Sequence, residues 1–340
     1  MKYENRCFAN NHRWSRRLVL SLIAGSAISS KVLAQESEKN FPTKRVTLTV
    51  PYGASSTNDI FARIVAEGLS TELGQSIIVE NKPGAGGTIG IGQVTRAPAD
   101  GYTLALISTS SVAINRALYR SLPYDPARDL EPIGIPSTTP NALIVSADQN
   151  INSVAELIEK AKSLSPGPIR YNSAGSGTSQ HLSSVLFARL GGFKAEHVPY
   201  RGQEGITGML GGQTQFGFAS VPSVVGLVRA GKLRILGVTG QRPSSAFPDV
   251  PTLVSQGFPA FAYGEIWYGV ATPSTVPAAI KDKLMQALSS IVEQPATRER
   301  LSKAGFDPAP RMTKAELHEF IAKQVAFWGD LVRDSGATAD

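Results

Sequence analysis

The 340-residue chain is long enough for one large or two ordinary domains with a substantial core. Its charged and hydrophobic fractions, 18% and 42%, are ordinary for a globular protein and argue against disorder. The formal net charge is +7, but residues 1–34 hold six of the 34 basic residues and one of the 27 acidic ones. The other residues therefore carry 28 basic and 26 acidic side chains, about +2, which gives nucleic-acid binding no electrostatic support.

The N-terminal segment has the pattern of a signal peptide. A basic stretch, 13–17, precedes an apolar run, 18–29, and small residues lead up to Ala34. The run is shorter than the ~20 residues of a membrane anchor. The sequence therefore predicts cleavage after Ala34 and release into the periplasm, and it leaves Sec and Tat export both open. Cys7, the only cysteine, would leave with residues 1–34, and with it any disulfide or thiolate metal site.

From residue 45 onward, strand patterns alternate with helical ones. Strands are expected at 45–51, 76–80, 102–107, 142–146, 169–172, 195–199, 215–219, 233–239 and 267–271. Helices are expected at 58–73, 88–96, 112–119, 153–162, 178–190, 204–210, 223–230, 278–293 and 314–332. Proline-rich passages at 122–140 and 242–259 interrupt the series.

This alternation predicts an α/β fold of two lobes, each a mostly parallel sheet flanked by helices, with a ligand cleft between the lobes. The expected organisation is a signal peptide at 1–34, a first part of lobe 1 at 35–140 and lobe 2 at 141–240. A return to lobe 1 is expected at 241–272, and C-terminal helices packing on the lobes at 273–340.

Three loops place small or hydroxyl residues between an expected strand and an expected helix start: 54–58, 84–88 and 173–178. A fourth, hydroxyl-only stretch covers 108–111. Free N–H groups and the positive dipole end at a helix N-terminus suit an anion, and glycine lets the backbone approach it. Each loop alone fits a plain helix cap. Two or more facing one another across a cleft indicate capture of a carboxylate.

Motifs for chemistry are weak by comparison. Neither glycine-rich loop completes the dinucleotide fingerprint. After the 84–88 loop, Ile89 stands where the third glycine belongs, and the 173–178 loop lacks the third glycine as well. Ser176 lies outside a nucleophile elbow, and His181 follows it on the same expected helix without an orienting partner. The remaining histidines have no metal-ligand spacing, and Asp59 with Arg63 fits a structural ion pair at i, i+4. The sequence thus predicts no enzyme, no cofactor and no metal.

Eight stretches in order resemble the substrate-binding proteins of tripartite tricarboxylate transporters, the Bug family. They are NKPGAGGTIG (81–90), DGYTL (100–104), LPYD (122–125), SAGSGT (173–178) with His181, VPYRG (198–202), AGKLR (230–234), PDVPT (248–252) and WYGVATPSTVP (267–277). The resemblance covers nearly the whole chain after residue 34. It implies a periplasmic, two-lobed (type II-like) receptor that closes on a small carboxylate and presents it transiently to membrane permease subunits.

The resemblance also implies which residues hold the ligand. The first-lobe set is Ser55, Ser56, Thr57, Asn58 and Asp59, with Gly86 and Ser108 from the neighbouring loops. The second-lobe set is Ser173, Ala174, Gly175, Ser176, Gly177, Thr178 and His181, with Tyr200 and Arg201 after the next strand. Two positions depart from the family pattern: Ser55-Ser56 replaces a usual Gly-Gly, and Gln215 stands where an acid is frequent.

Several alternatives stay open at this level. The ligand is a di- or tricarboxylate, an acidic amino acid or an aromatic acid. The same receptor, expected to be a monomer, could instead feed a sensor kinase, or the chain could be an exported enzyme.

Overall fold

The computed structural model describes residues 40–164, 166–200 and 204–339. The chain divides into two units, Met1–Thr43 and Lys44–Asp340, and the second is described below. The expected signal peptide and its cleavage site lie outside the described residues. Within the described part, no helix has both the length and the apolar character needed to span a bilayer.

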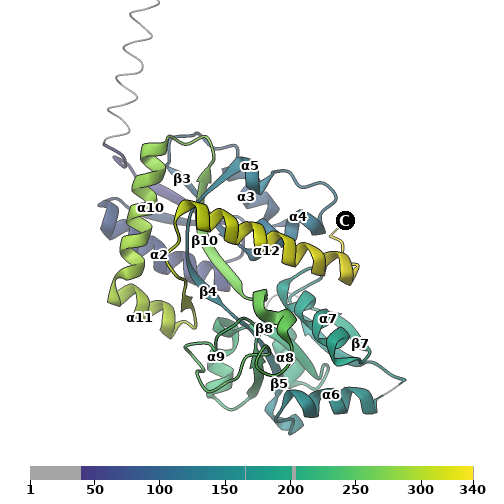
Figure 1. The fold of residues 1–340 in the computed structure, drawn as a ribbon. Coiled ribbons are helices and arrows are strands. Elements are labelled where there is room, and N and C mark those ends of the chain that lie inside the picture. The colour runs from purple at the N-terminus through teal and green to yellow at the C-terminus, as the bar shows by residue number, and fades with distance from the viewer. Residues whose placement is uncertain (1–39, 165, 201–203, 340) are drawn as a thin grey trace, which may run out of the picture. The chain divides into compact units, whose positions relative to one another are not determined.

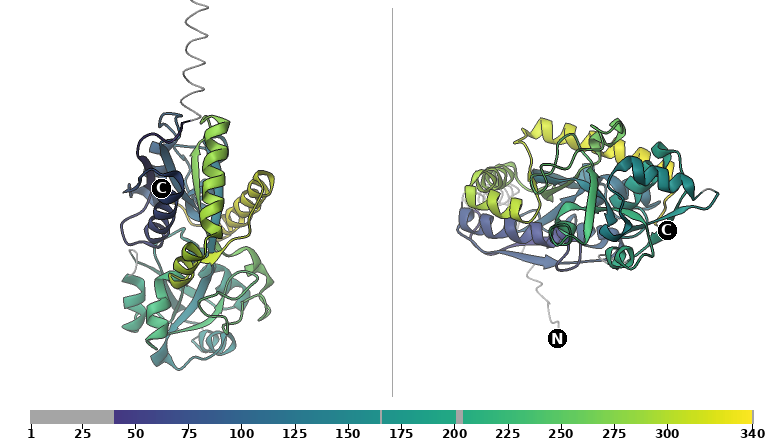
Figure 2. Two further views of the ribbon diagram at one scale, coloured as in Figure 1. Left: turned by 90° about the vertical axis from the view of Figure 1, so that its left-hand side faces the viewer. Right: turned by 90° about the horizontal axis from the view of Figure 1, so that it is seen from below.

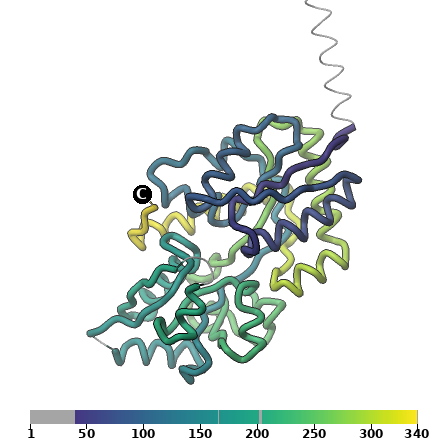
Figure 3. The backbone as a smooth tube through the Cα atoms, turned by 180° about the vertical axis from the view of Figure 1, so that it is seen from behind, coloured from purple at the N-terminus to yellow at the C-terminus, as the bar shows by residue number. Residues whose placement is uncertain are grey.

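The second unit contains two sheets (Figure 1), and each sheet with its helices is one lobe. The first lobe has a sheet of order β11 (Asp307–Pro308), β4 (Leu130–Thr139), β10 (Ile266–Pro273), β3 (Thr103–Ser108), β1 (Val46–Val50) and β2 (Ile77–Asn81). The second lobe has a sheet of order β7 (Ala195–Pro199), β6 (Ile169–Ser173), β8 (Phe216–Ser220), β5 (Asn141–Ser146) and β9 (Leu233–Val238). Figure 3 traces the two lobes from behind, with the purple and blue chain in the first and most of the teal chain in the second.

Helices fill the connections in both lobes. Those of the first lobe are α2 (Thr57–Leu73), η1 (Ala85–Gly87), α3 (Thr88–Val94), η2 (Ser110–Ile114), α4 (Asn115–Leu118), α5 (Pro126–Asp129), α10 (Ala278–Glu293) and α11 (Pro295–Lys303). Those of the second lobe are η3 (Ala147–Gln149), α6 (Val154–Ser163), α7 (Ser179–Gly191), α8 (Glu204–Leu210), α9 (Val221–Arg229) and η4 (Pro259–Tyr263). Figure 2 shows α10 flanking the first sheet and the second-lobe helices around the other.

The chain crosses between the lobes at adjacent strands. It leaves the first sheet at the end of β4 and enters β5 after Pro140, and it returns from β9 into β10. β4 and β10 pair antiparallel, with Thr139 opposite Ile266, so both crossings lie side by side. Two adjacent crossings of this kind form the hinge of a two-lobed protein.

The C-terminal helix α12 (Lys314–Ser335) joins the two lobes a third time (Figure 1). Near its start, Leu317 packs in a first-lobe core with Trp267. Near its end, Trp328 is fully buried in a core that contains Phe187 and Phe218 of the second lobe. The helix therefore adds apolar packing to both lobes.

Both sheets are mixed rather than mostly parallel. β1 pairs in parallel with β2 and β3, and β6 pairs in parallel with β7 and β8. The strands next to the crossings, β10 and β5, run antiparallel to their neighbours. The reason is topological: a strand that enters a sheet from the other lobe is not joined to its neighbour by the helical crossover that makes strands parallel.

Strand β4 lies in a passage where the sequence predicts an interruption of the strand and helix series. Pro132 and Pro136 lead to that prediction, since proline donates no hydrogen bond between strands. The strand nevertheless forms because β11 pairs only with its last part, at Ser137 and Thr138. Along most of its length β4 is thus an edge strand, the place where a sheet tolerates proline.

Candidate functional site

A cavity of about 650 Å³ lies between the lobes, at the ends of their strands. Its first-lobe wall consists of residues 52–58, Gly86, Ser108, Ser110, Ile266 and Tyr268. Its second-lobe wall consists of residues 172–174, 178–180, 218–220, Gly205, Ile206 and Ser223. The carboxyl ends of strands in α/β sheets are the usual place for a ligand, and the volume suits a small molecule.

The first-lobe wall includes the N-terminus of α2. Ser56 caps the helix, because its side-chain oxygen accepts a hydrogen bond from the N–H of Asp59 at 3.2 Å. Thr57 and Asn58 occupy the first two helical positions, where no intrahelical carbonyl can accept from their N–H groups. Asn58 Oδ1 is buried and has no hydrogen-bond partner among the described residues. Both N–H groups and this amide therefore stand at the cavity wall.

Asp59 is one of the expected ligand residues, yet it does not line the cavity. Its carboxylate accepts from the Ser55 N–H at 2.9 Å, from Arg63 Nε at 3.0 Å and from Asn81 Nδ2 at 2.9 Å. Burial works to raise the pKa of Asp59, but these hydrogen bonds outweigh it and hold the pKa below its usual value. Ser55 has a left-handed φ of 62°. Asp59 therefore positions the first loop, and the bond to Ser55 supports a backbone conformation that glycine would adopt freely.

The second-lobe loop, 173–178, closes on itself. Ser173 Oγ accepts from the Gly175 N–H at 3.1 Å and donates to the Gly175 carbonyl at 3.0 Å. Thr178 Oγ1 also donates to the Gly175 carbonyl, at 2.7 Å, and it accepts from the His181 N–H at 3.3 Å as the cap of α7. The Gly177 N–H donates to His181 Nδ1 at 3.1 Å. The glycine N–H groups are thus engaged inside the protein.

The free donors of this lobe lie one step further along the chain. Ser179 and Gln180 occupy the first two positions of α7, where their N–H groups have no intrahelical acceptor. Both residues line the cavity. α2 and α7 therefore present the same arrangement from opposite lobes: a capping hydroxyl followed by two unpaired N–H groups.

The cavity contains part of the expected residue set. Ser55, Ser56, Thr57, Asn58, Gly86, Ser108, Ser173, Ala174 and Thr178 line it. Asp59, Gly175, Ser176, Gly177, His181 and Tyr200 lie outside its lining. Tyr200 donates its hydroxyl hydrogen to Gln213 at 2.6 Å, and Arg201 falls outside the described residues. Gln215 is also remote from the cavity: its side-chain oxygen accepts from the Arg170 N–H.

The sequence did not predict several of the residues that line the cavity. Ser179 and Gln180 could have been predicted, since the two residues after a capping threonine carry free N–H groups. Tyr52 directly follows the first strand, and its hydroxyl lies 3.4 Å from Ser108 Oγ. Burial raises the pKa of Tyr52, against smaller lowering by hydrogen bonds with Ser108 and Ser110, so the phenol is a neutral donor. Ser220 and Tyr268 carry no local signal, because only strand order brings them here.

The lobes touch directly beside the cavity. Thr57 Oγ1 of the first lobe lies 3.3 Å from Ser220 Oγ of the second. Gly177 lies against Leu118 of the first lobe, whose side-chain atoms would be 2.4–3.0 Å from an added Cβ. The cavity is therefore bounded by contacts that any separation of the lobes has to break.

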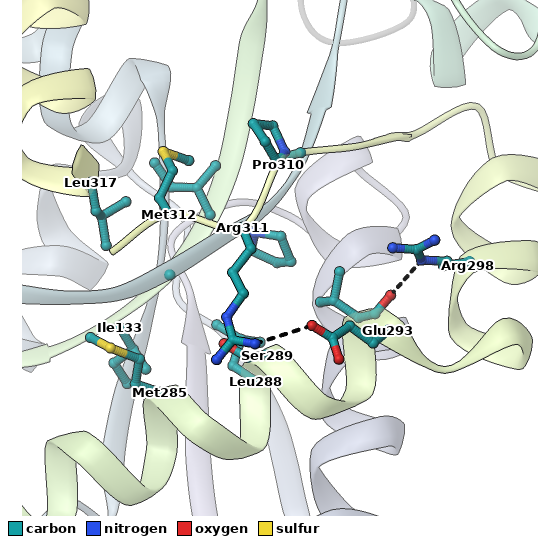
Figure 4. Close-up of a pocket in the computed structure, with 15 residues that line it drawn as sticks. Ile133, Met285, Leu288, Ser289, Glu293, Arg298, Pro310, Arg311, Met312 and Leu317 are labelled. Atoms are coloured by element: carbon teal, nitrogen blue, oxygen red, sulfur yellow. Dashed lines mark hydrogen bonds and ion pairs between the residues drawn. The ribbon is translucent and has the colours of Figure 1, made fainter. Parts of the chain in front are cut away.

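A second, smaller cavity of about 90 Å³ lies among β4, α10 and the chain before α12 (Figure 4). Its wall includes the apolar side chains Met285, Leu288 and Met312. Arg311 pairs with Glu293 at 3.4 Å on its rim. It contains none of the expected ligand residues, so the larger cavity is the candidate site.

Side chains suited to catalysis or metal binding are scarce in the larger cavity. Its described lining includes no aspartate, glutamate, histidine, lysine or arginine. The described part of the chain also has no group of three or more His, Cys, Asp or Glu side chains placed to hold a metal ion. What the site offers is backbone N–H groups, hydroxyls, amides and aromatic rings.

The comparisons with known proteins agree with this geometry. The family model described as "Tripartite tricarboxylate transporter family receptor" matches residues 61–337. The chain belongs to this receptor family. The resemblance drawn from the eight sequence stretches is thereby confirmed.

Similar members of the receptor family support the assignment. BugT of Bordetella pertussis is 29% identical over 321 residues, which covers 94% of this chain and 98% of BugT. The structure of the periplasmic binding protein BugD is 30% identical with a TM-score of 0.77, covering 88% of this chain and 99% of BugD. An R. palustris protein solved with adipate is 29% identical with a TM-score of 0.80, covering 88% and 99%. The predicted two-lobed periplasmic-binding-protein fold is confirmed.

Proposed function

We propose that this chain is an extracytoplasmic solute-binding protein that captures a small carboxylate in the cavity between its lobes and delivers it to a tripartite tricarboxylate-type permease. One observation carries the proposal: α2 and α7, from opposite lobes, both begin at this cavity. Each N-terminus attracts an anion, by roughly 0.3–1 kcal/mol when exposed and up to ~2 kcal/mol when partly buried. A carboxylate between them would accept from N–H groups of both lobes and so hold the lobes together.

The same cavity wall narrows the ligand chemistry. Because its described lining has no cationic side chain, the anion would be held by neutral donors and helix dipoles. Tyr52, Phe218 and Tyr268 supply aromatic surface for the rest of the ligand. Dicarboxylates such as the adipate of the R. palustris protein and aromatic acids both fit a site of this kind, with one carboxylate at the helix N-termini and the body against the rings.

Binding is tested by removing single N–H donors with proline. Thr57 and Ser179 stand at the first helical position, where proline fits, and the preceding residues already have the extended backbone that proline requires. Thr57→Pro and Ser179→Pro are each expected to weaken carboxylate binding by ~1.5–3 kcal/mol, one to two decades in Kd. Calorimetric titration with adipate, malate, citrate, glutamate and benzoate at pH 7.5 measures this effect.

The matched controls distinguish the effect of a lost backbone N–H from that of a lost hydroxyl, and an effect at the cavity from a general effect of proline on the fold. Thr57→Val and Ser179→Ala remove the hydroxyls but keep the N–H groups, so the difference from the proline variants belongs to the backbone donor. Ala278→Pro makes the same change at the first position of the exposed start of α10, away from the cavity. Equal affinities in the proline and hydroxyl-deletion variants would place the anion elsewhere, and turnover of any panel acid would indicate an enzyme.

Delivery to a permease is tested in cells. Deletion of the gene is expected to abolish uptake of the bound acid. Loss of gene induction with uptake intact would instead identify a receptor that feeds a sensor kinase. The predicted signal peptide is tested separately. If the exported protein begins far from Gln35, the predicted cleavage after Ala34 is wrong.

A further inference from the structure

Two histidines lie behind the 173–178 loop, stacked face to face. His181 of α7 and His197 of β7 have ring centroids 4.1 Å apart with 20° between the ring planes. Tyr171 of β6 stacks on both, at 6.2 Å from His181 and 5.1 Å from His197. Tyr171, Ser173 and His197 share one face of the β6–β7 pair, and α7 covers that face with His181. The stack therefore sits directly beneath the loop that ends at the cavity.

Each histidine makes a hydrogen bond to the loop. The Gly177 N–H donates to His181 Nδ1 at 3.1 Å. His197 Nε2 lies 2.7 Å from Ser173 Oγ. Because the Ser173 hydroxyl donates its hydrogen to the Gly175 carbonyl, the ring nitrogen is the donor of this bond. Ser173 lines the cavity, and Gly177 precedes the cap of α7 by one residue. The stack thus determines where the capping residue and the free N–H groups of α7 stand.

The His181 bond exists only when that ring is neutral. A neutral imidazole has one acceptor nitrogen, whereas a protonated imidazole donates from both nitrogens and accepts from neither. Protonation of His181 would set an N–H against the Gly177 N–H, and protonation of both rings would place two positive charges in one stack. Either event disfavours the loop conformation seen here.

The surroundings offer the rings no compensating charge among the described residues. Burial, with a smaller effect of His197, lowers the pKa of His181 to about 4, and burial lowers the pKa of His197. Burial raises the pKa of Tyr171 to about 12, so this ring stays neutral. Glu196 and Arg170 lie on the opposite face of the strand pair, because neighbouring strand residues alternate. On α7, Arg189 is two turns away and pairs with Asp334.

We propose that His181 and His197 are positioning residues that hold the 173–178 loop in its binding conformation, and that they do so only while the His181 ring is neutral. This inference rests on the proposed function, because the loop conformation matters to a ligand bound at the N-terminus of α7. Neither ring touches the cavity itself. They act through the Gly177 and Ser173 hydrogen bonds.

The direction of the pH effect follows from proton linkage. When the loop opens, His181 returns toward its ordinary pKa of 6.5, so the open state binds more protons. The bond is fully present above about pH 6.5 and is lost as the pH falls toward 4. For a shift from 6.5 to about 4, linkage gives an opening equilibrium about thirtyfold larger at pH 5 than at pH 7.5.

The test combines loop opening with binding in the full exported chain. Hydrogen exchange of the Gly177 amide, followed by NMR and corrected for intrinsic rates, is expected to show this increase in the parent protein. His181→Asn keeps an acceptor oxygen near the position of Nδ1 but cannot titrate, so its opening equilibrium should not change with pH. His318→Asn, on α12 beside Glu131, is the matched control and should behave as the parent protein.

Calorimetry at pH 7.5 with the same carboxylate panel provides the second readout. His181→Ala is expected to weaken binding about tenfold, the loss of one hydrogen bond, and His181→Asn to restore most of it. A flat pH profile in the parent protein, or the same profile in His181→Asn, would overturn the inference. So would equal affinity of His181→Ala and the parent protein. Absence of binding by every acid would overturn the proposed function instead, while the exchange profile would still decide the role of the histidines.

Discussion

Replacing Gly177 by valine is expected to destabilise the protein by about 2–5 kcal/mol and to abolish ligand binding. Gly177 has a φ of 73°, a backbone conformation that a β-branched residue adopts only with strain. An added Cβ would also lie 2.4 Å from Leu118 Cδ2 across the lobe boundary. From the sequence alone, glycine in this loop is expected to let the backbone approach an anion, and on that interpretation a larger side chain would block the ligand and leave the fold intact. The structure shows that Leu118 occupies the space beside Gly177.

Thermal melts and calorimetry of three variants test this expectation. Gly177→Ala is expected to lower the melting temperature and the ligand affinity less than valine does. It can therefore be measured even if the valine variant does not fold. Gly226 lies in the middle of α9, where an added Cβ would meet nothing within 4 Å, so Gly226→Ala should melt at the same temperature or higher, because alanine favours a helix. A Gly177→Val protein with unchanged melting and affinity would show that the loop tolerates another conformation.

Joining the lobes by a disulfide between positions 57 and 220 is expected to slow carboxylate entry at least about tenfold. The hydroxyl oxygens of Thr57 and Ser220 lie 3.3 Å apart, so Thr57→Cys with Ser220→Cys needs little movement to bond. The chain has one cysteine, Cys7, so a form cleaved after Ala34 as the sequence predicts would have no competing thiol. Stopped-flow binding to the oxidised protein, followed by reduction, measures the change.

The single-cysteine variants are the matched controls, because they alter the same contacts without a cross-link. Reduction should restore the entry rate of the double variant to that of the controls. An oxidised protein that binds as fast as the reduced one would show that the ligand enters without lobe separation. Small-angle scattering should then also show no decrease in radius of gyration on binding.

Much of the lobe architecture could be predicted from local sequence patterns. The helix predicted at 58–73 is α2 (Thr57–Leu73), because its apolar positions recur at helical spacing and Gly74 ends it. α11 was missed, since Leu301 is its only buried large apolar residue and no periodic stripe marks it. The antiparallel direction of β5 and β10 could not be read locally either, because it depends on which lobe the chain has just left.

The candidate site was also predictable only where the local sequence order places a residue at the cavity. Residues 55–58 follow a strand and open a helix, so their place at the cavity follows from local order. The tying of Gly175 and Gly177 into their own loop was not predictable, because it depends on His181 and on Ser173 with His197 behind it. Phe218 and Tyr268 required the strand order of both sheets.

The central claim is that one small carboxylate binds between the lobes at the starts of α2 and α7. Native mass spectrometry of the exported protein, purified without added acids, tests it most directly. We expect a single retained acid in a one-to-one complex with the parent protein. The Thr57→Pro/Ser179→Pro double variant should lose it, and Ala278→Pro should keep it. An acid retained equally by all three proteins would contradict a site at these two helix N-termini.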